Sequence, residues 1–527
     1  MRKIFIIILL CIATILLFAC ENDPPVENTP LHNGILHLSL STQIQTVDPA
    51  YAQSDGELLL SDLVYSCLVD IHDGEITPEL ADAWQVSSDG LIYTFYLRKG
   101  VLFHNGKEMT ADDVKFSFER ILRLATPTSY IFTNVKGADE VLQDESKTLS
   151  GIEVVDPYTL KITLIKPQEN FLTYLAMPAA SVLDRNELVQ HGANFALAST
   201  DEEAYPLPSG TGPFSLGEYL EGKSVALGMF EEYFMDSSHI ERIELLQNIP
   251  PKDGMVKMEA GTIDVVQNAL SGDASEGINI AGFIQIQKPV RLIRYLVINP
   301  NKAPFNNQEL RRAVFSAISG NDIVNQVRNG FGICPAEGLC SYWYNLSPDA
   351  PARGYDTQTS INKLAEAGYP NGSGLPSLTL LCGPNVEDIK IAKKVASDLS
   401  KIGCKLTVKS LSYRELRTAI RQGDASFYLG TFSDKGGGLD IFFSEVVDSR
   451  YQGVIGDGSW TSILNSAYDA SEKNKLELFS QVEQQLTEQG ILLCLYFEIS
   501  DYAIEKSWSS LVLDDSGTLN LNKLLAK

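Results

Sequence analysis

The sequence predicts a mixed α/β fold, in which strands and helices alternate along the chain and part of the sheet is parallel. Three stretches support this prediction: a strand–helix–strand pattern at 377–411, a hairpin followed by a capped helix at 91–124, and a second capped helix within 301–324. The chain has 527 residues, of which 44% are hydrophobic and 21% charged. That length and composition are typical of a globular protein with more than one domain-sized unit.

The stretch at 377–411 predicts two parallel strands joined by a helix. The run "SLTLLC" is a short apolar strand, and "CKLTVKSL" alternates apolar and polar residues, with Leu406 and Val408 on one face. Between them, Asn385 can cap a helix that Gly403 ends. The apolar residues of this helix follow helical spacing: Ile389, Ala392, Ala396 and Leu399. A helix between two strands is the usual crossover connection of a parallel pair.

The other two stretches each predict a helix with an apolar face. In the first, "LIYTFYLRKG" alternates as a strand does, and Asn105-Gly106 signals a hairpin turn. Thr110 is then an N-cap with Asp113 at the third helical position. Its helix presents an apolar stripe of Val114, Phe118, Ile121 and Leu122. The second helix follows an Asn cap, with one face formed by Leu310, Ala313, Val314, Ala317 and Ile318.

The N-terminus predicts export and lipid anchoring. Met1-Arg2-Lys3 is a short basic region, and residues 4–19 are almost entirely apolar, a length between a signal segment and a spanning helix. The stretch ends in "LLFAC", which resembles a bacterial lipobox whose acylated thiol is Cys20. We therefore expect a lipoprotein signal peptide at 1–20 and a flexible, Pro-rich tether at 21–30. The alternatives are a plain secretory signal and a membrane anchor.

Charge and motif content exclude several function classes. Asp and Glu number 67 and Lys and Arg 42, for a net charge of −25, which argues against nucleic acid as a partner. The chain lacks GxSxG and HExxH motifs, and we expect neither an enzyme nor a cofactor. No CxxC or HxxxH spacing occurs, so we expect no metal site. An exported chain permits disulfides, and Cys334 and Cys340 bracket a short loop and could pair.

Four motifs together carry a resemblance to a known family. They are "PELADAWQVSSDGLIYTFYLRKGVLFHNGKEMTADDVKFSFERIL" (78–122), "PSGTGPFSL" (208–216), "LVINPNKAPFNNQELRRAVFSAIS" (296–319) and "LAEAGYPNG" (364–372). Their order along nearly the whole mature chain resembles the extracellular solute-binding protein family 5. This is the oligopeptide-, dipeptide- and nickel-binding group of ABC importers.

The resemblance implies a fold of two lobes that close on a ligand. It implies a discontinuous lobe I of residues 31–290 plus 491–527, and a lobe II of residues 291–490. The chain would cross between them near 288–294 and 491–495. The implied function is that of a monomeric, extracytoplasmic, lipid-anchored receptor that delivers peptides to an ABC permease with its ATPase subunits. The alternatives are another small solute, such as a nickel complex or a sugar, and a peptide sensor without its own permease.

The resemblance also implies site residues. In peptide-binding members, the stretch matching "GTFSDKGGG" carries an aspartate that pairs with the α-ammonium of the ligand. Here that residue is Asp434, preceded by Gly430, Thr431 and Phe432. This sequence departs from the family pattern, because Thr431 stands in place of a tryptophan and Lys435 with three glycines replaces an aromatic and acid-proline end. Tyr130 and Tyr413 match pocket aromatics of the family more loosely.

Overall fold

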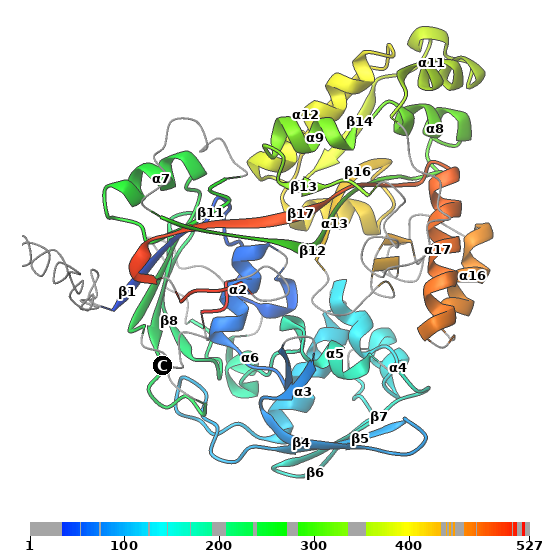
Figure 1. Cartoon of the computed structure of the whole chain (residues 1–527). Coiled ribbons are helices and arrows are strands. Elements are labelled where there is room, and N and C mark those ends of the chain that lie inside the picture. Colours follow the sequence, from blue (N-terminus) through cyan, green and yellow to red (C-terminus); the bar gives the residue numbers. More distant parts are fainter. Residues whose placement is uncertain are drawn as a thin grey trace, which may run out of the picture. The chain divides into compact units, whose positions relative to one another are not determined.

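A computed structural model gives the arrangement of the chain (Figure 1). The structure describes residues 34–521 except 53, 73–74, 125–126, 145, 169, 192–206, 236–239, 271–282, 336–354, 434–438, 440–441, 444–445, 448–457, 469, 471, 509 and 514–518. Residues 35–527 form one compact unit. Among the described residues no helix is both long and apolar enough to cross a membrane.

Most strands belong to one mixed sheet of eleven strands. In spatial order its main path is β15 (Leu406–Ser410), β14 (Leu378–Cys382), β16 (Phe427–Ser433), β12 (Ile284–Ile298), β17 (Leu492–Ile504), β11 (Val265–Gln267), β1 (Ile35–Ser39), β10 (Arg242–Leu246), β9 (Ser224–Met229) and β8 (Phe214–Leu220). The short β13 (Gly332–Ile333) pairs with β17 off this path. β14 is parallel to both β15 and β16, and β1 is parallel to β10 and β11. The predicted mixed α/β fold with a partly parallel sheet is therefore confirmed.

Two smaller sheets lie in the first part of the chain. One is the hairpin of β2 (Val69–His72) and β3 (Glu75–Pro78). The other has the order β4 (Ala81–Val86), β5 (Ile92–Leu97), β7 (Thr159–Thr163) and β6 (Ile152–Asp156), and all its pairs are antiparallel.

Helices connect and cover the strands. Those of the first half are α2 (Asp55–Val64), α3 (Ala111–Arg123), α4 (Ala138–Gln143), α5 (Phe171–Leu175), α6 (Arg185–His191) and α7 (Pro251–Glu259). Those of the second half are α8 (Gln308–Ser316), α9 (Gly320–Val327), α11 (Thr357–Glu366), α12 (Val386–Ser400), α13 (Tyr413–Arg421), α16 (Ser459–Tyr468) and α17 (Glu472–Glu488). Short 3-10 turns include η1 (Pro49–Tyr51) and η2 (Pro127–Phe132).

The three stretches singled out in the sequence fold as predicted, with small differences. Asn385 caps α12 by accepting the N–H of Asp388, and Gly403 has φ +83° after the helix. Thr110 and Asp113 form a capping box on α3, whose predicted stripe is buried. The predicted face of α12 is displaced, because Ile391 and Val395 are fully buried while Ala396 is only half-buried. α8 ends at Ser316, so Ala317 is its cap and not part of the helix.

The motif "PSGTGPFSL" lies against the end of α2. A Cβ added to Gly210 would stand 1.8 Å from the carbonyl oxygen of Val64, so only glycine fits there. His104 holds the same loop, because its Nδ1 accepts the N–H of Gly210 and its Nε2 lies 3.0 Å from the carbonyl oxygen of Gly212. Burial lowers the pKa of His104, which favours the neutral ring that this acceptor role requires. This packing explains why the motif needs glycine at both positions.

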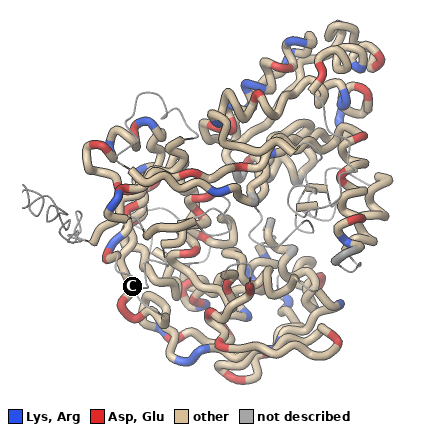
Figure 2. The backbone as a smooth tube through the Cα atoms, in the orientation of Figure 1, with Lys and Arg blue, Asp and Glu red and all other residues tan. Residues whose placement is uncertain are grey.

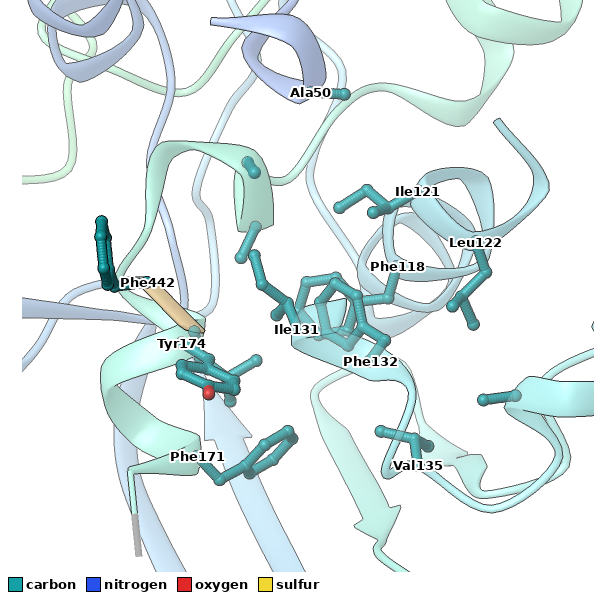
Figure 3. Close-up of a cluster of buried hydrophobic side chains, with 14 of the residues drawn as sticks. Ala50, Phe118, Ile121, Leu122, Ile131, Phe132, Val135, Phe171, Tyr174 and Phe442 are labelled. Atoms are coloured by element: carbon teal, nitrogen blue, oxygen red, sulfur yellow. The ribbon is translucent and has the colours of Figure 1, made fainter. Parts of the chain in front are cut away.

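The apolar core falls into large clusters that combine distant parts of the chain. One joins residues 36–265 with residues 502–521 at the C-terminus, and another draws only on residues 296–496. A third joins residues 50–182 with residues 293–497. Figure 3 shows part of it, where Phe118 of α3 stacks on Phe132 with ring centroids 4.4 Å apart, and Phe442 belongs to the same cluster.

Candidate functional site

The candidate site lies where β16 ends, beside the two longest strands of the sheet. β12 pairs with β16 on one side and with β17 on the other, antiparallel in both cases. In Figure 1 these strands run side by side. The register places Tyr295 opposite Gly430 and Arg294 opposite Thr431. The stretch predicted to bind ligand therefore begins at Gly430 on β16, which pairs with β12.

Gly430 and Phe432 have roles in packing that the sequence did not reveal. A Cβ on Gly430 would lie 2.3 Å from the ring of Tyr295, so the glycine makes room for that side chain. Phe432 is buried and packs edge-on against Phe442, with ring centroids 5.2 Å apart. Tyr295 contacts the same Phe442 ring at 5.5 Å. Contact of Gly430 or Phe432 with a ligand stays a prediction.

Thr431 is exposed, and its hydroxyl oxygen accepts a hydrogen bond from Nη1 of the buried Arg294. This contact joins the predicted site to a group of charged residues beneath it. We call Arg294, Arg328, Glu387, Asp388 and Glu498 the charge cluster. They come from β12, the C-cap of α9, the first turn of α12 and β17.

Ion pairs connect every member of the charge cluster. Arg294 reaches Asp388 at 2.8 Å, Glu387 at 3.3 Å and Glu498 at 3.5 Å. Arg328 reaches Glu387 at 2.8 Å and Glu498 at 3.0 Å. The side chain of Arg328 is only 1% exposed and that of Glu498 5%, whereas that of Glu387 is 24% exposed. Of these three side chains, that of Glu387 is therefore the most exposed to solvent.

The carboxyl groups of the cluster differ in their proton affinity. Burial alone would raise the pKa of Glu387, but Arg328 and Arg294 outweigh it and lower the value to about 2. Burial raises the pKa of Glu498 to about 7, against the opposing effect of Arg328. Burial also raises the pKa of Asp388. The hydroxyl of Tyr496 donates a hydrogen bond to Glu387 at 3.1 Å, which further favours its ionised form.

The charge cluster was not predicted from the sequence. A signal was present, because Arg294 and Glu498 each interrupt an otherwise apolar strand run, in "LIRYLVI" and "LLCLYFEI". A charged residue inside such a run is rarely buried unless it is paired. The partner residues on α9 and α12 carry no comparable signal, because helices often present charged residues to solvent.

The remaining predicted site residues are only partly described. Asp434, Lys435 and Cys340 lie outside the described residues, as does Cys20. Tyr130 lies in η2 and Tyr413 is the first residue of α13, and their side chains are also outside the described part. Burial raises the pKa of Cys334 to about 11, and its pairing with Cys340 stays a prediction. In the described part of the chain, no group of three or more His, Cys, Asp or Glu residues is placed to hold a metal ion.

Charge over the described residues is mixed. In the view of Figure 2, Lys and Arg are scattered among Asp and Glu along the backbone.

Comparison with known proteins gives a consistent result. The profile of the bacterial extracellular solute-binding proteins, family 5, matches residues 75–452. Heme-binding protein A of Haemophilus influenzae is 26% identical over 493 residues, covering 90% of this chain and 89% of the relative. The dipeptide-binding protein of Escherichia coli strain K12 is 25% identical over 481 residues, covering 86% of this chain and 87% of the relative.

Solved structures show the same fold at lower sequence identity. The substrate-binding domain of an oligopeptide ABC transporter from Bacillus anthracis superposes with a TM-score of 0.81 at 19% identity, covering 93% of this chain and 98% of that chain. DppA from Helicobacter pylori in complex with the peptide STSA superposes with a TM-score of 0.76 at 21% identity, covering 93% and 97%.

Proposed function

Because the chain belongs to the bacterial extracellular solute-binding proteins of family 5, and so is a binding protein and not an enzyme, we propose that it binds peptides for an ABC importer. The observation that carries the proposal is similarity over nearly the full length of both chains to a dipeptide-binding protein. The fold shared with a peptide-bound relative supports it. Peptide binders of this kind grip the backbone and termini and leave side chains in wet pockets, which permits many sequences.

Two lobes that close on the peptide are part of the proposal. Lobe I comprises residues 31–290 with 491–527, and lobe II residues 291–490. Two core clusters support this division, because the C-terminal residues 502–521 share one with residues 36–265, while residues 296–496 form another. The third cluster, which joins residues 50–182 with residues 293–497, spans both lobes. β12 and β17 would be the two crossings, because β12 (Ile284–Ile298) and β17 (Leu492–Ile504) overlap the segments 288–294 and 491–495.

Purified protein should carry or accept a peptide, and native mass spectrometry of the protein as isolated tests this. We expect a bound mass that dissociates into peptide fragments, and a rise in thermal stability when that peptide is added back. A ligand in hundredfold excess over its Kd stabilises the native state by about 2.7 kcal/mol. Neither a bound peptide nor a thermal shift with a library of short peptides would contradict the proposal.

Heme is the second candidate ligand, favoured by the Haemophilus influenzae relative named as heme-binding. The same mass spectra separate the two candidates, because heme has one fixed mass and absorbs visible light, whereas co-purified peptides give a distribution of masses.

We further propose that lipid on Cys20 anchors the mature protein to the cell envelope, where a permease with its ATPase subunits receives the ligand. The Cys20→Ser variant should appear in the soluble fraction or remain as an unprocessed precursor, because serine lacks the thiol that is acylated. Cell fractionation and electrophoretic mobility measure this, with Cys67→Ser, a buried thiol, as the control. Unchanged membrane association together with unchanged electrophoretic mobility of Cys20→Ser would show that another feature anchors the protein.

A further inference from the structure

The ladder between β12 and β17 is interrupted at Glu498. Pro289 stands opposite Ile499 and Ile293 opposite Phe497, so residues 290–292 of β12 face Glu498 alone. On the other edge of β17, Glu498 is in register with Gly332 of β13. Extra residues in one strand break the regular pairing and let that strand bend. The geometry of β12 and β17 at this point therefore depends on side chains more than on ladder hydrogen bonds.

Charged and titratable groups face Glu498 from every element packed around it. They are Arg294 on β12, Arg328 at the end of α9, Glu387 and Asp388 on α12, Tyr496 on β17 and Asp55 at the start of α2. The Oε1 of Glu498 lies 3.0 Å from Arg328, and its Oε2 lies 3.5 Å from Nε of Arg294. Among the described residues, neither this Oε2 nor this Nε makes a hydrogen bond.

The charge cluster has one negative charge too many when every group is ionised. Three carboxylates face two guanidinium groups, and Asp55 adds a further negative charge nearby. An excess charge in a buried site is costly, and a proton on one carboxyl group removes it. Glu387 and Asp388 each accept a hydrogen bond from an arginine. Glu498 has the carboxylate oxygen that makes none, and is therefore the member best placed to take the proton.

We propose that Glu498 holds a proton in the folded protein, and that losing this proton loosens the junction of β12 and β17, which makes the junction sensitive to pH. The value of about 7 for the pKa of Glu498 agrees with this assignment. Since β12 and β17 are the proposed crossings between the lobes, the proton would also influence closure on a ligand. The effect on closure rests on the proposed function, whereas the protonation of Glu498 does not.

The pH dependence of thermal stability tests the proton without a ligand. An acid whose pKa is raised on folding binds more protons in the native state than in the unfolded state, so stability falls as pH rises from the ordinary value toward the raised one. Glu498→Gln has no proton to lose. The Tm of Glu498→Gln minus the Tm of the wild type should therefore increase by about 2–4 °C when the pH is raised from 5 to 8.5.

Glu309→Gln is the matched control, because Glu309 pairs with Arg312 and Lys363 outside the charge cluster. Its Tm should follow that of the wild type in parallel over the same pH range. Hydrogen exchange then locates the effect: from pH 6 to pH 8.5, and after correction for intrinsic rates, amides of residues 290–292 and 497–499 should lose protection in the wild type and keep it in Glu498→Gln.

Parallel Tm curves for the wild type and Glu498→Gln would overturn the proposal. Should Glu498→Gln fail to fold, Glu79→Gln takes the place of the wild type in an infrared titration, because burial also raises the pKa of the Glu79 carboxyl group, which would give a carbonyl band of its own. In Glu79→Gln, the carbonyl band of protonated Glu498 must be present at pH 6 and disappear between pH 6 and pH 8.5. Absence of that band at pH 6 would also overturn the proposal. A peptide identified by mass spectrometry, titrated at both pH values, tests closure separately, and failure to bind at either pH would count against the proposed function only.

Discussion

Replacing Asp434 by asparagine should weaken peptide binding by roughly 30- to 4,000-fold. The reason is that the family resemblance assigns this carboxylate to the α-ammonium of the ligand. Truncating one partner of a buried charged pair costs about 2–5 kcal/mol, much of it the penalty for the charge left unpaired. Isothermal titration with a peptide identified by mass spectrometry measures the effect. Asp424→Asn, whose carboxylate is 68% exposed shortly before β16, is the control and should bind as the wild type does.

A two-by-two titration shows whether the lost interaction is the ammonium pair itself. N-acetylation removes the positive charge of the peptide and should weaken binding to the wild type by a similar factor. It should weaken binding to Asp434→Asn much less, because both changes remove one interaction. Additive losses would mean that Asp434 and the amino terminus act independently, so that "TFSDKGGG" is near the site without binding the ammonium.

Replacing Arg294 by methionine should destabilise the fold by about 3–5 kcal/mol, because removing one partner of a buried ion pair leaves an uncompensated charge. Asp388 would then lose its pair with Arg294, while Glu387 and Glu498 would share the single guanidinium of Arg328. Urea denaturation followed by circular dichroism measures the loss. Arg242→Met is the control, since the Arg242 side chain is 49% exposed and its pair with Glu244 should contribute at most about 1 kcal/mol.

A second variant separates lost charge balance from lost packing. The double variant Arg294→Met with Asp388→Leu removes a cation and an anion together, and buried pairs replaced by apolar residues are often tolerated. It should recover part of the stability that Arg294→Met loses. Arg294→Met within about 1 kcal/mol of the wild type would show that the charge cluster does not hold β12, β16, β17 and α12 together.

The fold and the local elements were predictable because short-range chemistry decides them. Asn385 caps α12 since its side chain accepts a free backbone N–H, and Asp113 accepts the N–H of Thr110 at the start of α3. Gly403 ends a helix and Gly106 forms a turn since both adopt positive φ. The displaced face of α12 was less predictable. Helical spacing identifies a stripe, but whether Ile391 or Ala396 is buried depends on what packs against the helix.

The sequence by itself determined the alternation of strands and helices, the family, and the stretch that begins at Gly430. Tertiary structure alone decided that Tyr295 covers Gly430 and that Arg294, beneath Thr431, gathers Arg328, Glu387, Asp388 and Glu498 from three other elements. The physical reason is range. Capping and periodicity act over a few neighbouring residues, whereas the state of a buried charge depends on all groups within a few ångströms, whatever their distance along the chain.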